Sequence, residues 1–226
     1  MALSDYALTT LATLKAELGI TGTSEDVRLE RLIEVASRRL IGLLNRAQLH
    51  YQVDRAESVR GFGTNTLRLQ LAPLLAIDGI TFSADGGASS STIGATGYTI
   101  ADSGLGWVLR LGGVWAYTGD YMGALPDPLP GTERPYYTVT YTGGYVTPKQ
   151  VEDDALLTRT LPYDIEDACI ALATQRYYDD GTGRDIKSER LLEGSVSYES
   201  ARDSSGRVML PSVVQAVVDA YGWPAL

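Results

Sequence analysis

The sequence predicts an α+β protein. N-terminal and central helices form a small helical bundle, an antiparallel β region is inserted between them, and an extended C-terminal tail ends in a short helix. Two changes of periodicity predict this order. Apolar residues recur at helical spacing before residue 46 and again from residue 161, while alternating residues with Gly and Asn turns indicate strands in between.

The changes of period also place the segment boundaries. We expect a helical N-terminal part over 1–46, a β-rich region over 47–147, a core helix over 148–180, and an extended arm with a terminal helix over 181–226. Two irregular stretches interrupt the β-rich region. Residues 84–97 are small and polar and predict a flexible loop, whereas 112–135 combines four prolines with aromatic residues and predicts a contact loop.

The first 45 residues predict two helices. Leu11, Leu14 and Leu18 share one face of the first, and Gly19 ends it. Ser24 is the expected N-cap of the second. The apolar stripe of the second helix consists of Leu29, Leu32, Ile33, Ala36, Leu40, Ile41 and Leu44.

Short runs with a period of two predict the strands of the β-rich region. They are LHYQV at 49–53, SVRGF at 58–62, TLRLQL at 66–71, LLAIDGITF at 74–82, YTIA at 98–101, WVLRL at 107–111 and YYTVTYTGGYV at 136–146. Pro73 lies between two of these runs, where a chain reversal is natural.

A third helix is expected over 161–180. Pro162 suits its first position, and Asp164, Glu166 and Asp167 lie in its first turns, where the helix dipole favours acids. The tail then alternates through SERLLEGSVSYES like an edge strand and ends in a short helix that opens at Pro211. Its apolar residues must be buried, and we expect another subunit or another protein to cover them.

Composition excludes several classes of protein. The net charge is -9, and residues 150–226 carry 14 acidic against 7 basic side chains, so binding of nucleic acid by counterion release is not expected. No apolar run approaches the ~18 residues of a membrane helix, and the first ten residues predict no signal peptide. A single cysteine allows no internal disulfide.

The sequence offers little support for catalysis, and we expect neither an enzyme nor a cofactor. His50, the single histidine, is either a catalytic base or, as its strand context favours, a structural residue. Cys169 lies among alanines and is expected in the core. GFGTN at 61–65 lacks the helix that a dinucleotide loop requires, and the carboxylates at 152–154 and 179–180 favour solvated helix ends over a metal site.

Several segments, in this order, resemble one protein family. The N-terminal segment ELGITGTSEDVRLERLIEVASRRLIGLLNR, which ends in the basic residue Arg46, is similar to the helical start of the head–tail connector proteins of tailed bacteriophages, also called neck adaptor or head-completion proteins. LRLQLAPLLAIDGITF resembles the family's strand–Pro–strand element, and YYTVTYTGGY before LPYDIEDACIALATQRYYDD resembles its Tyr-rich strand and following helix. The tail ending LPSVVQAVVDAYG also fits, while 84–134 is longer than in compact members.

The resemblance implies a structural virion protein at the neck, assembled in the host cytoplasm. Such a protein forms a ring, commonly of twelve copies, under the portal protein. It prolongs the DNA channel without binding DNA specifically, and it offers a surface to a stopper or tail protein. No membrane partner is implied. The alternatives are another neck or tail component, such as a stopper or tail terminator, or a β-rich module that binds glycans through Trp107, Trp115 and Tyr121.

Three sets of residues are expected to make the contacts. The portal-docking set in the terminal helix is Val213, Val217, Tyr221, Trp223 and Leu226. The inter-subunit arm, within 186–199, would bury Leu191, Leu192, Val196 and Tyr198. The outward contact loop would present Trp115, Tyr117 and Tyr121.

Overall fold

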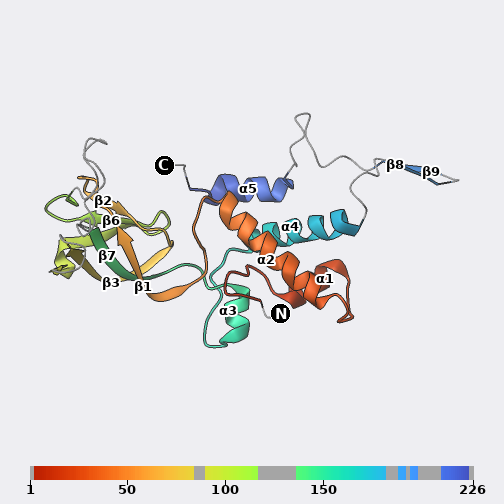
Figure 1. Ribbon diagram of the computed structural model, residues 1–226, viewed down its shortest axis with the longest axis horizontal. Coiled ribbons are helices and arrows are strands. Elements are labelled where there is room, and N and C mark those ends of the chain that lie inside the picture. Colours follow the sequence, from red (N-terminus) through yellow and green to blue (C-terminus); the bar gives the residue numbers. More distant parts are fainter. Residues whose placement is uncertain are drawn as a thin grey trace, which may run out of the picture. The chain divides into compact units, whose positions relative to one another are not determined.

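The chain has an α+β fold that divides into two compact units (Figure 1). The computed structural model describes residues 3–83, 90–116, 136–181, 188–191, 194–197 and 210–223. Residues 1–46 and 146–226 form the first unit, here called the helical unit, and residues 47–145 form the second, the β unit.

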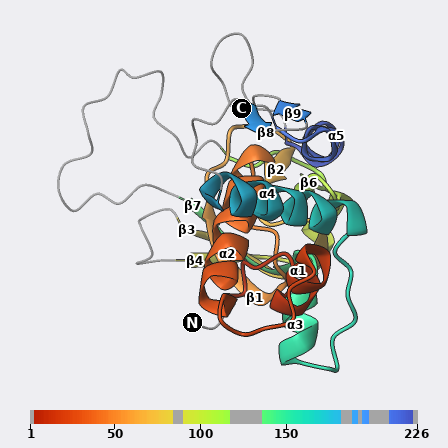
Figure 2. The same cartoon turned by 90° about the vertical axis from the view of Figure 1, so that its right-hand side faces the viewer.

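The described residues of the helical unit form five helices. They are α1 (Leu11–Leu18), α2 (Asp26–Leu43), α3 (Pro148–Asp153), α4 (Tyr163–Gly181) and α5 (Ser212–Tyr221). The two long helices α2 and α4 pack against each other, α1 contacts both, and α5 packs on α4 (Figures 1 and 2). The apolar stripe predicted for α2 is buried in this bundle.

The helix ends follow the capping chemistry of the sequence, with one difference. Thr10 Oγ1 accepts the backbone N–H of Thr13 at the start of α1, and Gly19 ends that helix in the left-handed conformation. The predicted cap at Ser24 is wrong, because Glu25 occupies the N-cap of α2 without a side-chain cap. The Asp26 N–H donates to the Thr23 carbonyl and closes a turn, so Ser24 lies one residue before the N-cap position.

The segment 148–180, predicted as one core helix, contains the two helices α3 and α4. Thr147 and Gln150 form a reciprocal capping box around Pro148 at the start of α3. α3 ends at Asp153, and α4 begins only at Tyr163, directly after Pro162.

A buried carboxylate joins three parts of the helical unit. Glu166 on α4 is 5% exposed. Its Oε1 accepts the Thr9 hydroxyl at 2.8 Å, and its Oε2 pairs with Arg159 Nη1 at 2.6 Å. The Arg159 guanidinium in turn lies 3.7 Å from the centre of the Tyr163 ring. Glu166 therefore ties the N-terminal segment and the loop before α4 to the helix itself.

The part of the β unit that the structure describes forms two antiparallel sheets. The strands are β1 (Gln52–Val59), β2 (Thr66–Arg68), β3 (Leu74–Ser83), β4 (Ser90–Ile93), β5 (Tyr98–Asp102), β6 (Trp107–Arg110) and β7 (Tyr136–Gly143). One sheet has the order β1-β7-β3-β4 and the other β2-β6-β5. Residues from both sheets, among them Leu67, Val108, Ile80 and Val139, share one buried core.

The predicted flexible loop over 84–97 is wrong for its second half. β4 pairs with β3, with Ile93 opposite Ile80, and a short 3-10 helix, η1 (Ala95–Gly97), follows. Ile93 packs against the core of the β unit, which favours an ordered strand despite the surrounding serines. Residues 84–89 lie outside the described residues.

The ends of the β unit pair with each other. The Tyr51 N–H donates to the Tyr145 carbonyl at 2.8 Å, and the Tyr145 N–H donates to the Leu49 carbonyl at 2.7 Å. Gly144 beside them has φ of 90°, and a Cβ there would lie 2.4 Å from the His50 carbonyl oxygen. Only glycine fits this close approach.

The tail contains a hairpin where a lone edge strand was expected. β8 (Ser188–Leu191) and β9 (Gly194–Ser197) pair antiparallel, with Glu189 opposite Val196. Each strand therefore supplies a backbone pairing partner to the other. Among the described residues, none of the helices is both long and apolar enough to span a bilayer.

Candidate functional site

Helix α5, which carries most of the predicted docking residues, is held on the helical unit by apolar contacts. Val214 and Val217 are buried at one turn's spacing, on the side of α5 that packs on α4. Beyond the helix, the Trp223 side chain is 8% exposed, and the backbone N–H of Trp223 donates to the Leu44 carbonyl at 3.0 Å. The Arg46 guanidinium lies 4.7 Å from the Trp223 ring centre.

Polar contacts hold the same end of α5. Arg46 Nη2 donates to the Tyr221 carbonyl at 3.2 Å, and Asn45 Nδ2 donates to the Trp223 carbonyl at 3.4 Å. The Tyr221 hydroxyl donates to Asp164 Oδ2 at 2.9 Å. Residues after the end of α2 and at the start of α4 therefore both hold the C-terminal end of α5 in place.

This arrangement differs from a terminal helix that waits for another protein to cover it. Val217 and Trp223 are buried within their own chain, because the tail supplies apolar side chains to α4 and to the end of α2. Tyr221 is half-buried, and Val213 is 37% exposed. Leu226 lies outside the described residues. Among the described members of the predicted docking set, Val213 is the apolar side chain that is exposed.

The other two predicted sets are only partly described. In the arm, Leu191 and Val196 lie in the β8–β9 hairpin, while Leu192 and Tyr198 lie outside the described residues. In the contact loop, Tyr117 and Tyr121 also lie outside them.

An outward role for Trp115 is wrong. Its side chain is 0% exposed, its Nε1 donates to the Val108 carbonyl at 3.3 Å, and its ring meets Tyr137 edge-on at 5.2 Å between centroids. A large apolar ring next to a strand contributes most when the core buries it. Trp107, by contrast, is 41% exposed.

The residues weighed for catalysis have structural surroundings. His50 is 5% exposed and forms a bridge with Tyr145 at the edge of the β unit. Burial raises the pKa of the Cys169 thiol to about 12, and Ser37 Oγ lies 3.3 Å from its sulfur. The described part of the chain holds no cluster of three His, Cys, Asp or Glu side chains placed for a metal.

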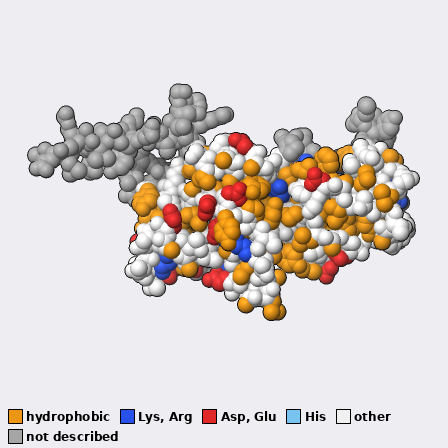
Figure 3. Space-filling model, turned by 180° about the vertical axis from the view of Figure 1, so that it is seen from behind, with side chains coloured by type: hydrophobic (Ala, Val, Ile, Leu, Met, Phe, Trp, Pro, Cys, Tyr) orange, Lys and Arg blue, Asp and Glu red, His pale blue; other side chains and the backbone are white. Residues whose placement is uncertain are grey.

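The surface has exposed apolar side chains that suit protein contacts. On the face in Figure 3, hydrophobic side chains form several groups among polar atoms, with acidic side chains spread between them. Leu156 is 93% exposed and Tyr163 73% exposed on the helical unit, and Phe62 is 67% exposed on the β unit. Such side chains are candidates for burial in an assembly.

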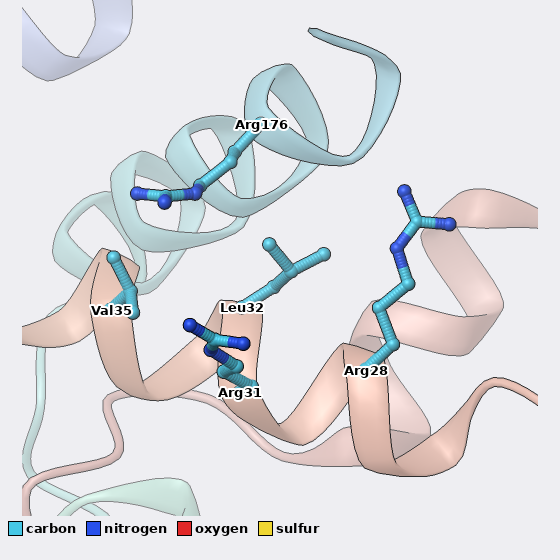
Figure 4. A pocket seen from close by; sticks show the side chains of 5 residues that line it. All are labelled: Arg28, Arg31, Leu32, Val35 and Arg176. Carbon is cyan, nitrogen blue, oxygen red and sulfur yellow. The ribbon is translucent and has the colours of Figure 1, made fainter. Parts of the chain in front are cut away.

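A pocket of about 230 Å³ opens between α2 and α4 (Figure 4). Its lining is three arginines and two apolar side chains: Arg28, Arg31, Leu32, Val35 and Arg176. This site cannot be recognised from the sequence. Arg28 and Arg31 share a helix face three residues apart, but Arg176 joins them only because α4 packs on α2.

Known proteins share the fold of this chain, although no protein family matches its sequence. The chain matches no protein-family model and no curated protein. It is similar to a chain of a structure described as the neck of an empty gene transfer agent particle computed with C6 symmetry, with a TM-score of 0.56 and 16% identity over 100% of this chain and 94% of that one. It is also similar to a chain of the virion of a native gene transfer agent particle, with a TM-score of 0.53, 15% identity and the same coverage. These similarities establish a shared fold.

Proposed function

We propose that this chain is a structural protein of the neck of a tailed phage-like particle, where it acts as a head–tail connector. Copies form a ring beneath the portal, prolong the DNA channel and link the head to the next neck or tail protein. The observation that carries the proposal is the fold shared along the whole chain with a chain from a particle neck. The order of motifs along the sequence supports the same role.

The charge and the surfaces of the molecule are consistent with this role. A net charge of -9 suits a wall past which DNA slides without adhering. Exposed apolar side chains such as Leu156 and Val213 suit protein contacts within a ring and with its neighbours. The sixfold symmetry applied to the similar neck is compatible with a ring of six or twelve copies.

The proposal also assigns attachment to the portal to the C-terminal region. Because Val217 and Trp223 are committed to the core of their own chain, the contact falls to the outer side of α5 around Val213. Deleting the helix would uncover the core and confuse folding with docking. A point substitution on the outer side separates the two effects.

The test is complementation of a producing strain that lacks this chain. Wild-type protein is expected to restore tailed particles, and electron microscopy averaged about the portal axis is expected to show its density as a ring below the portal. Heads that fill and keep their tails without the protein would contradict a neck role. Density on the tail side, away from the portal, would replace the connector assignment with a stopper or tail terminator.

Portal attachment is tested in the same system with Val213→Glu. The variant is expected to fold normally yet to leave heads without the ring, because it places a charge in an apolar contact. Val53→Glu is the matched control, since Val53 is 59% exposed on the β unit. Equal particle yields from the two variants would contradict attachment through α5.

A further inference from the structure

The pocket between α2 and α4 has the chemistry of a receptor for an acidic, apolar segment. Leu32 and Val35 supply apolar lining, and the exposed arginines Arg31 and Arg176 come from the two facing helices (Figure 4). A ligand that fits both parts carries an aliphatic side chain next to carboxylates.

Two of the three arginines are available for such a ligand. Arg28 is engaged, because its Nη2 donates to the Tyr177 carbonyl at 3.3 Å and its guanidinium lies 4.7 Å from the Tyr177 ring centre. Arg31 and Arg176 have no ion-pair partner among the residues that the structure describes. An incoming carboxylate would therefore pair with these two arginines without breaking any ion pair that the described residues make.

The loop after α3 presents a matching segment. Leu156 is 93% exposed, more than any other large hydrophobic residue among those described. Asp154 fixes it there, because its Oδ1 accepts the Leu156 N–H at 3.0 Å and its carbonyl accepts the Leu157 N–H at 3.0 Å. The leucine is thus held outward by a turn, and little ordering is needed when it binds.

Carboxylates surround this leucine. The side chains of Glu152 and Asp153 are each 54% exposed on α3, and Asp154 follows them. Lys149 pairs with Glu152 and Asp153 and offsets one of the three negative charges. The segment 152–156, here called the acidic leucine turn, therefore keeps a net negative charge beside an exposed aliphatic side chain.

We infer that the acidic leucine turn of one copy docks into the pocket between α2 and α4 of a second copy. Leu156 packs on Leu32 and Val35, while Glu152 and Asp153 face Arg31 and Arg176. The two surfaces are different parts of the same chain, so the contact is heterologous and propagates from copy to copy. Its closure into a ring rests on the proposed function.

A nucleic-acid ligand fits the same pocket less well. Phosphates would pair with the arginines but would make no apolar contact with the half-buried Val35, while Leu32 is only 4% exposed at the floor of the pocket. The net charge of -9 also disfavours association of DNA with the molecule as a whole. A second copy of the chain supplies both the carboxylates and the leucine.

Cysteine cross-linking tests the contact. One sample carries Val35→Cys and another Leu156→Cys, and the native Cys169 is buried and stays unreactive. When the two variants are mixed at high concentration and oxidised, a disulfide joining one chain of each is expected, whereas each variant alone is expected to cross-link little. Chains of different mass, distinguished by a tag, identify the mixed product. The same oxidation is applied to particles that contain both variants.

Charge reversal tests the ionic part. Arg31→Glu with Arg176→Glu, or Glu152→Arg with Asp153→Arg, is expected to lower the yield of mixed disulfide by about tenfold, because like charges then face each other. Combining the reversed pocket on one chain with the reversed turn on the other is expected to restore it. Circular dichroism checks that each variant folds.

The outcomes separate this contact from the neck role. A mixed disulfide in free protein or in particles, sensitive to charge reversal and rescued by the swap, supports the contact. Absence of that product from both samples overturns it, even if the chain still occupies the neck. Preferential Leu156→Cys homodimers also overturn it, as does binding of short duplex DNA that is lost with Arg31→Glu and Arg176→Glu. A chain absent from particles overturns the proposed function, while the free-protein result still decides the contact.

Discussion

Glu166 shows how one side chain can connect distant parts of the sequence. Because its buried carboxylate holds both Thr9 and Arg159, Glu166→Ala leaves an unpaired arginine and is expected to lower the free energy of unfolding by about 3 kcal/mol. Glu166→Gln keeps an acceptor for Thr9 and should cost less. Chemical denaturation measures both.

The matched control is Glu152→Ala. Its carboxylate lies 3.8 Å from Lys149 and is 54% exposed, so the change is expected to cost about 0.5 kcal/mol or less. Equal losses for Glu152→Ala and Glu166→Ala would show that the buried network contributes nothing beyond a surface ion pair.

Tyr141 gives the β unit a dependence on alkaline pH. Burial, and then its 2.5 Å hydrogen bond to Glu57, raise the pKa of the Tyr141 hydroxyl above its usual 10.0. The folded form therefore favours the protonated phenol. This contribution is complete below the unfolded pKa of 10.0 and is lost as the pH rises above it.

Tyr141→Phe is expected to cost about 1–3 kcal/mol at neutral pH, because the buried Glu57 carboxylate loses a donor. Above pH 10 the variant should lose stability less steeply than the wild type. Urea denaturation across this range measures the difference, and parallel pH profiles for the two proteins would contradict it. Tyr136→Phe is the matched control, since Tyr136 is half-buried at the start of the same strand, outside the β-unit core.

At this scale, sequence predicts residues that act through local pattern and misses those that act through distant partners. The apolar stripe of α2 and the stop at Gly19 follow from spacing and from the backbone preference of glycine. Glu166 has the signature of an ordinary first-turn acid, because its partner Thr9 lies 157 residues away. Trp115 looks like a surface aromatic until the sheets close over it.

Helix α5 is the element whose environment differs most from the sequence expectation. The spacing of Val214 and Val217 shows that one side of the helix is buried, but it cannot show which surface buries it. Helix α3 could not be predicted as a separate helix, because its six residues are too few to display a helical period. The pocket was hidden because it needs two helices to form.

The packing of α5 predicts a loss of stability when its anchor is removed. Trp223→Ala is expected to lower the free energy of unfolding by about 3 kcal/mol, because it removes a buried ring and its contact with Arg46. Val213→Ala, on the exposed side, should change it by about 0.5 kcal/mol or less. Thermal or urea unfolding measures both. A Trp223→Ala variant as stable as wild type would mean that α5 contributes little to the unit.

On the scale of the whole molecule, the two units are expected to fold separately. The β unit has its own core, including Leu69, Ile80 and Tyr141, and a buried network of its own around Glu57. Residues 47–145 produced alone should therefore give a cooperative unfolding transition and dispersed amide resonances. A broad, non-cooperative transition for the isolated segment would show that the β unit depends on the rest of the chain.

The paired ends of the β unit make residues 47–145 a self-contained insertion between the two parts of the helical unit. Because residues 49–51 are hydrogen-bonded to Tyr145, the chain enters and leaves the β unit at adjacent points. A different β segment inserted between these two points would leave the order of the helices along the chain unchanged. Replacing the β unit by another segment would therefore change one unit and keep the other, provided that the new segment keeps a glycine at position 144.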